Sequence, residues 1–341
     1  MRYKLLILFI FSLTLFVFNC SEDEEETTSI PPRDRAEQQA SDMDTLQNYF
    51  DTHYYNSGAL SALTTYPTLD DIVISKLEEG ETQPPNTTML SSAVEPKTTT
   101  YQDVSYTYYI LSIEQGLGEN PHFTDQVRVN FEGTTMNGDE FDSSVNPIDL
   151  DLVFSITGWN RVLPQFKTAS TFTTNNDGTV TFENYGIGVM FLPSGLGYFN
   201  NAVSGISAYS CLNFKFELFQ HKVMDHDNDF IPSYMEDENG NLDVFDDNTD
   251  NDRFNDFSDN DDDGDGFKTF REVTYTTFTD NTRTALQAQM QAEEPLASNQ
   301  FFLPIEQEND GSFSVKLITL EDTNGNGIPN YLDSTDAQTL N

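Results

Sequence analysis

Apolar and polar residues follow one another in four distinct patterns along the chain, and each pattern predicts a different kind of segment. The first is an unbroken apolar run, residues 5–18, which follows Arg2 and Lys4. A short apolar run behind basic residues is the layout of a secretory signal peptide, and it is too short to cross a bilayer. We therefore expect residues 1–19 to be a signal peptide, residues 20–34 to be a flexible acidic linker, and the protein to be exported.

The second pattern, in residues 35–100, is polar with a few apolar positions. Near its start Leu46, Tyr49 and Phe50 recur at helical spacing, which predicts a short amphipathic helix. Residues 76–100 are rich in Glu, Thr and Pro and are predicted to form a loop. We interpret the whole segment as an N-terminal extension made of helix and loop.

The third pattern, in residues 101–221, consists of short runs of Val, Ile, Phe, Tyr and Thr separated by Gly, Asn and Pro. This is typical of strands joined by turns. The sequences VRVNFEG (residues 127–133) and NFKFELF (residues 213–219) alternate apolar and polar side chains. Such alternation predicts an antiparallel sheet with one buried face.

The fourth pattern, in residues 222–341, is acidic and is interpreted as a separate module. Residues 225–272 alone hold 18 acidic and only three basic side chains. Further on, TRTALQAQMQAEEPL (residues 282–296) predicts one helix and FSVKLITL (residues 313–320) one strand.

Composition narrows the class of protein. The 341 residues are 37% hydrophobic and 13% aromatic, which is enough to bury a core and excludes a wholly disordered acidic chain. Sixteen Lys and Arg stand against 57 Asp and Glu, so the formal net charge is −41. That charge repels phosphate backbones and argues against any nucleic acid as a partner.

Cys20 follows the apolar run directly, and this junction resembles the lipobox of bacterial lipoproteins. The resemblance implies that Cys20 is acylated and anchors the protein to a membrane of the cell envelope. The alternative is a plain signal peptide or an uncleaved anchor, with Cys20 as an ordinary thiol. The SEDEEE sequence that follows (residues 21–26) resembles a surface-export signal of some Gram-negative lipoproteins, or is a solvated spacer.

Four motifs occur in one order within the strand-rich segment. They are VNFEGTTMNGDEFDSS, ITGW, FLPSGLGY and LNFKFEL, at residues 129–144, 156–159, 191–198 and 212–218. Together they resemble the FKBP family of peptidyl-prolyl cis-trans isomerases. The resemblance implies an α+β fold in which a bent antiparallel sheet wraps around one short helix, with a shallow aromatic pocket between them.

The resemblance also implies roles for single residues. Three would act on the twisting bond: Trp159 as the floor under the proline ring, Asp142 near the carbonyl carbon and Tyr198 as a hydroxyl that binds a carbonyl oxygen. The walls that bind substrate would be Phe131, Phe141, Ile148, Ile156, Ile206 and Phe214.

Isomerisation itself explains these residue types. Rotation about the X-Pro bond is slow because it breaks amide resonance, at a barrier of roughly 18–20 kcal/mol. The twisted state carries less charge on its carbonyl oxygen, so an apolar pocket that excludes water favours it over the planar state. No cofactor is required for catalysis, and the expected substrates are proline-containing unfolded or exported polypeptides.

The sequence also departs from the family at the pocket. Phe131 stands where the family usually has Tyr, Ile148 replaces an aromatic wall, and the flap GISAYSC (residues 205–211) lacks the usual prolines. These changes keep a second reading open, in which the pocket belongs to a catalytically weak peptide-binding chaperone.

The acidic segment contains calcium-like loops. In DDDGDGFKTFRE (residues 261–272) Asp261, Asp263 and Asp265 fall at loop positions one, three and five, the Phe267 carbonyl at seven and Glu272 at twelve. Alternating carboxylates around a glycine turn, closed by a bidentate acid, match the Ca²⁺ loop of an EF-hand.

Two further segments share a related pattern and resemble thrombospondin type 3 repeats. Their candidate metal ligands are Asp225, Asp227, Asp229 and Glu236 in DHDNDFIPSYME, and Asp322, Asn324, Asn326 and Asp333 in DTNGNGIPNYLD. A degenerate copy runs from Asp250 to Asp259. We expect structural Ca²⁺ here, which would couple metal to folding. The alternatives are an acidic linker with accidental regularity, or a calcium-dependent surface adhesion module.

Overall fold

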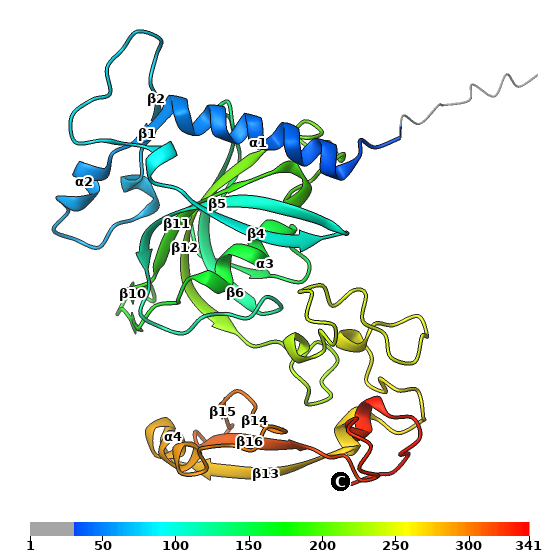
Figure 1. Cartoon of the computed structure of the whole chain (residues 1–341). Helices are drawn as coiled ribbons and strands as arrows, with labels where there is room; N and C mark the ends of the chain where they lie inside the picture. The colour runs from blue at the N-terminus through cyan, green and yellow to red at the C-terminus, as the bar shows by residue number, and fades with distance from the viewer. Residues whose placement is uncertain (1–30, 341) are drawn as a thin grey trace, which may run out of the picture. The chain divides into compact units, whose positions relative to one another are not determined.

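The structure, a computed structural model, describes residues 31–340 (Figure 1). The signal peptide expected in residues 1–19, most of the linker and Cys20 lie outside the described residues. From Arg33 onward the described chain forms one compact unit. It is a mixed α+β structure in which strands outnumber helices.

The main sheet has seven antiparallel strands in the order β4-β5-β11-β12-β6-β7, with β8 paired to β6. The strands are β4 (Glu95–Tyr101), β5 (Val104–Gln115), β6 (Gln126–Thr135), β7 (Glu140–Ser143), β8 (Ile148–Asp151), β11 (Gly186–Leu192) and β12 (Leu212–Lys222). One face of this sheet packs around the short helix α3 (Thr157–Val162) and the 3-10 turn η3 (Leu163–Gln165) that follows it.

The opposite face of the sheet is also covered, which corrects the prediction of a single buried face. Every residue of β11 is buried, and β12 has buried side chains on both faces. Helix α1 (Arg35–Thr52) lies over the second face and buries Leu46 and Phe50 against Ile187 and Phe191. The sequence GIGVMFL of β11 is apolar throughout because it serves two cores, so it gave no alternation to read.

The N-terminal extension is built around a small sheet of order β2-β1-β3. Its elements after α1 are β1 (His53–Tyr55), α2 (Ser57–Ser61), the turn η1 (Leu69–Asp71), β2 (Ile74–Lys76), β3 (Thr88–Met89) and the turn η2 (Leu90–Ser92). Strand β4 starts at Glu95, inside the segment predicted as loop. It is a largely exposed strand at the edge of the main sheet, so its sequence EPKTTTY is polar and carries Pro96 where an edge tolerates it.

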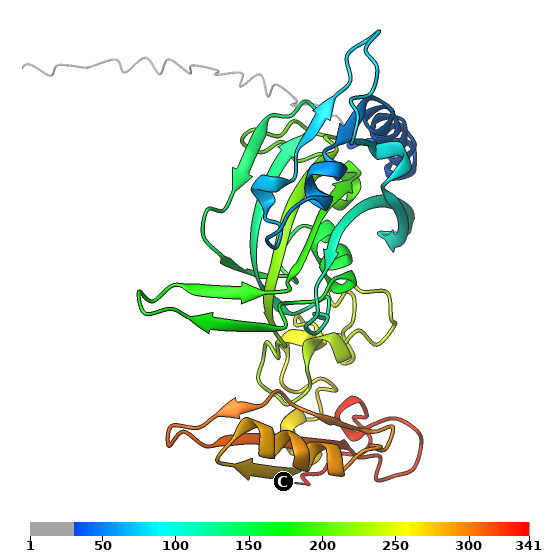
Figure 2. The ribbon, with the colours of Figure 1, turned by 90° about the vertical axis from the view of Figure 1, so that its left-hand side faces the viewer.

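A two-stranded hairpin separates η3 from β11. It consists of β9 (Thr171–Thr174) and β10 (Val180–Glu183), and Figure 2 shows it extending away from the main sheet. Its residues are exposed apart from the half-buried Phe182.

The C-terminal part of the chain contains a second antiparallel sheet of order β13-β16-β14, with β15 paired to β16. Its elements are β13 (Val273–Asp280), α4 (Arg283–Ala292), β14 (Gln300–Phe302), β15 (Glu306–Gln307) and β16 (Phe313–Leu320). The predicted helix and strand are therefore confirmed as α4 and β16. Among the described residues, no helix combines the length and the apolar character that crossing a membrane requires.

Candidate functional site

Trp159, on α3, packs its indole against aromatic rings of the main sheet. The ring centroids lie 5.1 Å from Phe214 and 5.6 Å from Phe131, and the indole is only 5% exposed. Phe216 approaches from deeper in the sheet at 6.3 Å. The indole and its neighbours thus form a closely packed aromatic floor in the larger core cluster.

Two glycines permit this packing. A Cβ on Gly158 would lie 2.2 Å from a Leu192 methyl, so α3 can rest on β11 only because that position has no side chain. On β6, a Cβ on Gly133 would lie 2.7 Å from the Phe141 ring and 2.8 Å from the Phe214 ring. The two rings, 5.4 Å apart and edge to face, therefore occupy the space that Gly133 leaves.

The rim of this floor is more open. Phe141, Ile156 and Tyr198 are half-buried against the same cluster, while Ile206 is 4% exposed within it. Asp142 is exposed on β7, where it pairs with Gly133. Burial, together with the charge of Asp142, raises the pKa of the Tyr198 hydroxyl, which therefore remains a proton donor at neutral pH.

The residues implied by the resemblance come together with one exception. Trp159, Phe131, Phe214, Ile206, Phe141, Ile156 and Tyr198 belong to or pack on one cluster, and Asp142 is near enough to Tyr198 for its charge to act there. Ile148 lies on β8 in register with Val129 and is 37% exposed, outside that cluster. Among the residues named from the resemblance, Ile148 is therefore the one that lies apart from the cluster, and their roles stay predictions.

Sequence reasoning missed the residues that hold the rim from behind. The Asp42 carboxylate of α1 is buried, and its Oδ2 accepts hydrogen bonds from Ser194 N at 2.8 Å and Ser194 Oγ at 2.7 Å. Arg35 lies 4.1 Å over the Phe199 ring and donates to the Gly195 carbonyl at 3.4 Å. These contacts fix the segment that leads into Tyr198. No motif signals them, because 152 residues separate Asp42 from Ser194.

The acidic loops share one construction that their sequences only partly reveal. Four twelve-residue loops, at residues 225–236, 248–259, 261–272 and 322–333, each place a 3-10 turn at positions nine to eleven. The turns are η5 (Ser233–Met235), η6 (Asp256–Ser258), η7 (Thr269–Arg271) and η8 (Asn330–Leu332). The degenerate copy thus begins two residues before Asp250, with Asn248 at position one.

Each loop is closed by the same hydrogen bond. The backbone N–H at position two donates to the buried side chain at position nine in all four loops. The acceptors are Ser233, Asp256, Thr269 and Asn330, at 3.2, 2.8, 3.4 and 2.9 Å from their donors. The copies are therefore structural repeats, including the one whose sequence is least regular.

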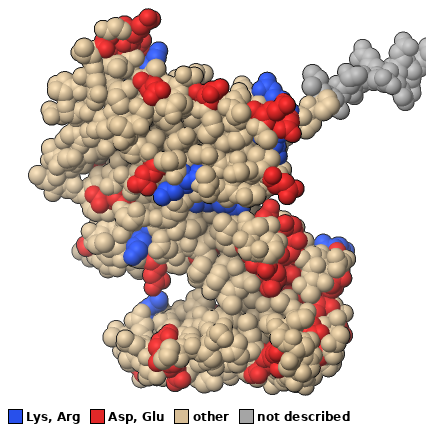
Figure 3. Space-filling view, viewed as in Figure 1, with Lys and Arg blue, Asp and Glu red and all other residues tan. Residues whose placement is uncertain are grey.

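Carboxylates converge at three places among the described loops, and Figure 3 shows acidic side chains gathered over this part of the surface. The groups are Asp227, Asp229, Glu236 and Asp262; Asp250, Asp252 and Asp259; and Asp261, Asp263 and Asp265. In each group, one oxygen from each residue lies within 4.8 Å of the corresponding oxygens of the others. Glu272 is 1% exposed, and both its oxygens are without a hydrogen-bond partner in the described chain. Phe267, whose carbonyl was predicted as a ligand, lies between Asp265 and η7.

Asp225 and Asp322, at position one of their loops, lie outside these three groups and bind the backbone of their own loops. Asp225 accepts hydrogen bonds from the backbone N–H groups of Asn228, Asp229 and Phe230, and Asp322 does the same for its own loop. These bonds form the tight turn that brings the later ligands together.

The last loop differs from the others. Its Asn324 and Asn326 side chains donate to Asp333 Oδ2 at 2.8 and 2.7 Å, so three of its predicted ligands contact one another. Hydrogen bonds from Thr335 and from these amides lower the pKa of Asp333 to about 2.

In the first group, formed by Asp227, Asp229, Glu236 and Asp262, burial and mutual repulsion disfavour the ionised carboxylates when only protein atoms surround them. Burial, with neighbouring carboxylates, raises the pKa of Asp227 to about 9 and that of Asp262 to about 11. The same causes raise the pKa of Asp229 to about 8 and hold that of Glu236 well above its usual range. Glu272 is not a member of the third group, but burial and the charges of that group raise its pKa to about 9. Hard oxygen donors that are buried and unpaired fit a divalent cation such as Ca²⁺.

Among models of protein families, one described as BamM C-terminal matches residues 226–299. No curated protein matches the sequence.

Solved structures of FKBP-type isomerases match part of the chain. FkpA from Escherichia coli is 28% identical, over 38% of this chain and 52% of FkpA, with a TM-score of 0.30. A peptidyl-prolyl cis-trans isomerase from Pseudomonas syringae is 21% identical over 38% of this chain and 80% of its own, with a TM-score of 0.29. The N-terminal domain of FKBP42 from Arabidopsis thaliana is 13% identical over 38% and 94%, also with a TM-score of 0.29. The chain spans about half the length of FkpA.

Proposed function

We propose that the protein is a peptidyl-prolyl cis-trans isomerase of FKBP type that acts on exported polypeptides. The observation that carries this proposal is the aromatic floor of Trp159, Phe131 and Phe214, with a rim formed by Phe141, Ile156 and Tyr198. A proline ring is an apolar group that packs well on half-buried aromatic and aliphatic side chains such as those of the rim, and aromatic walls are the usual lining of small binding sites.

In this mechanism the chain lowers the barrier without covalent chemistry. The floor holds the proline ring and excludes water, which favours the twisted amide over the planar one. The Tyr198 hydroxyl donates a hydrogen bond to a substrate carbonyl oxygen. Asp142, at the rim, interacts with the partly positive carbonyl carbon of the twisting bond. No proton is transferred.

Further parts of the proposal concern location and the acidic loops. We propose that Cys20 carries lipid and anchors the protein in the cell envelope, and the match to the BamM C-terminal model supports an envelope protein-assembly context. Two observations support a structural Ca²⁺ in the loop 261–272: Asp261, Asp263 and Asp265 converge there, and both buried oxygens of Glu272 lack a hydrogen-bond partner among the described residues.

A protease-coupled proline-isomerisation assay tests the enzyme. Tyr198→Phe removes one hydrogen bond of about 1 kcal/mol, so we expect a roughly fivefold lower kcat/KM. Asp142→Ala should cost on the order of tenfold. Asp139→Ala, an exposed aspartate in the turn before β7, is the matched control and should leave the rate unchanged.

The absence of the hydroxyl at Phe131 favours a second candidate, a peptide-binding chaperone. That ring is 7% exposed and belongs to the floor, but unlike Tyr it has no O–H to hold Asp142. Proline peptides that bind to the wild type with no rate above the uncatalysed background would exclude the enzyme and leave the chaperone.

A further inference from the structure

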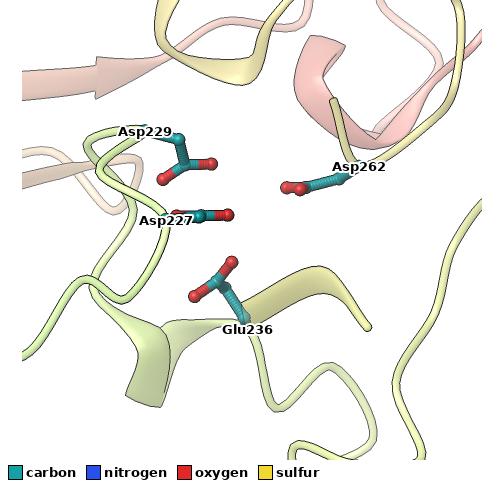
Figure 4. A group of neighbouring side chains, drawn as sticks. All are labelled: Asp227, Asp229, Glu236 and Asp262. Carbon is teal, nitrogen blue, oxygen red and sulfur yellow. The ribbon is translucent and has the colours of Figure 1, made fainter. Parts of the chain in front are cut away.

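Four carboxylates from two different loops meet in the acidic region. Asp227, Asp229 and Glu236 come from the loop 225–236, and Asp262 comes from the loop 261–272. Figure 4 shows the four side chains pointing toward one another. One oxygen from each side chain lies within 4.8 Å of those from the other three, which is the spacing of ligands around one cation.

These carboxylates are buried and have almost no polar partner. Asp229 is fully buried, and Glu236 and Asp262 are each 1% exposed. Seven of the eight oxygens of the four groups accept no hydrogen bond within the described residues. The exception is Asp229 Oδ1, which accepts from Ile231 N at 2.7 Å. Buried oxygens that face one another without a donor require a partner from outside the chain.

Within the part of the chain that the structure describes, no cationic side chain supplies that partner. Among residues 31–340, no ion pair joins any of the four acids to Lys, Arg or His. Four carboxylates at this spacing repel one another strongly in a buried setting, and a divalent cation reverses the sign of that interaction.

Asp262 is unusual for its place in the loop. Position two holds His226, Thr249 and Thr323 in the other loops, and the pattern assigns it no ligand role. The Asp262 backbone N–H keeps the common bond to Thr269 Oγ1 at 3.4 Å, so its main chain belongs to the loop 261–272. Only its side chain reaches the carboxylates of the loop 225–236.

We propose that Asp227, Asp229, Glu236 and Asp262 form a Ca²⁺ site that cross-links the first and third acidic loops. The ligands are all hard oxygens, which Ca²⁺ accepts six to eight at a time. Protein Zn²⁺ sites usually include His or Cys ligands, which this group lacks, and Mg²⁺ is held by fewer carboxylates and keeps its waters. Such an ion closes the segment between the loops much as a disulfide would. The site is separate from the isomerase proposal.

Thermal melting of the full chain in EDTA and in Ca²⁺ tests the site through Asp262→Asn. In EDTA we expect the variant to melt above the wild type, because one of four mutually repelling carboxylates is gone. In Ca²⁺ we expect the order to reverse, because the ion has lost a charged ligand. The exposed Asp310→Asn is the matched control and should follow the wild type in both conditions. If Ca²⁺ raises the melting temperature of wild type and of Asp262→Asn by the same amount, the proposal is overturned. It is also overturned if Mg²⁺ raises the melting temperature of the wild type as much as Ca²⁺ does.

Calorimetric titration with Ca²⁺ separates this site from the neighbouring loop. Asp262→Asn and Glu236→Gln should each weaken one binding event by roughly tenfold or more, and the double variant should lose little beyond either single variant because both act on one ion. Glu272→Gln should weaken a different event. If Asp262→Asn instead weakens the same binding event as Glu272→Gln, and the double variant loses little more, then Asp262 binds the ion of its own loop. The proposed cross-link is then wrong.

Discussion

Asp42 connects α1 to the segment that leads into Tyr198, so Asp42→Ala tests how the candidate pocket is supported. The substitution leaves two buried donors of Ser194, its N–H and its hydroxyl, without their acceptor. Each unpaired buried donor costs about 1–3 kcal/mol. Relief from burying a carboxylate offsets part of this cost, so we expect a net loss of ~2–4 kcal/mol.

Denaturant unfolding and thermal melting measure that loss. For a chain of this size about 1 kcal/mol corresponds to ~2–4 °C, so the melting temperature should fall by roughly 5–15 °C. Asp44→Ala is the matched control, because Asp44 is exposed on the same helix and a surface change of this kind costs within about 0.5 kcal/mol. If the two variants unfold with the same free energy, Asp42 does not hold the rim.

The pH dependence adds an independent check. Burial raises the pKa of Asp42 from its ordinary 3.8, although hydrogen bonds from Ser194 and Gln38 oppose the shift. A raised pKa means that the folded state favours the protonated acid. The stabilisation is therefore complete below pH 3.8 and is lost as pH rises through the folded value. Asp42→Asn cannot ionise, so its stability relative to wild type should improve across that window.

Two further substitutions probe the sheet. Gly133→Ala places a methyl group against the Phe141 and Phe214 rings, and should cost about 1–3 kcal/mol and weaken proline-peptide binding; an unchanged melting temperature would show that the rings can move aside. Burial alone would lower the pKa of His221, but its 2.7 Å hydrogen bond to Asp125 and the nearby acidic charge outweigh burial and raise it from 6.5. The destabilisation caused by His221→Gln should therefore be largest below pH 6.5 and shrink as pH rises through the raised value, and a pH-independent difference in unfolding free energy would contradict this.

The parts of the fold that could be predicted are those with a local signal. The spacing of Leu46, Tyr49 and Phe50 predicts α1, and the alternation in NFKFELF predicts β12. Strand β4 was missed because an exposed edge strand needs no apolar face. The second covered face was missed because a strand buried on both sides no longer alternates. The periodicity of apolar residues shows which faces of a strand are buried. It does not show which distant segment of the chain covers each face.

The candidate sites show the same division. Resemblance in four motifs was enough to assemble Trp159, Phe214 and Tyr198 in one cluster. The resemblance could not indicate Asp42, because the sequence around a single polar residue in a helix does not show which distant residue it binds. Loop spacing likewise pointed to Asp227, Asp229 and Glu236, which lie together in the structure, but not to Asp262, which joins them from another loop. The hydrogen bond from position two to position nine spans the same number of residues in every loop. An alignment that starts the degenerate loop at Asn248 could therefore have revealed this bond from the sequence.

Point substitutions test the roles of the acidic loops and of the rim better than deletion of residues 222–341 does. The reason is that the acidic region directly contacts the domain that holds the main sheet. Arg161, two residues beyond Trp159 on α3, donates from Nη1 to the Leu242 carbonyl at 2.8 Å and is 5% exposed. Phe123 and Val153 of the sheet domain form a buried apolar cluster with Val244 and Phe257. Deleting residues 222–341 would expose that cluster and leave a guanidinium without its carbonyl acceptor, beside the helix that carries the indole. A loss of isomerisation after such a deletion would therefore report damage to α3 as readily as a role for the loops. Asp262→Asn alters the loops without cutting the chain, and Tyr198→Phe alters the rim without touching Arg161.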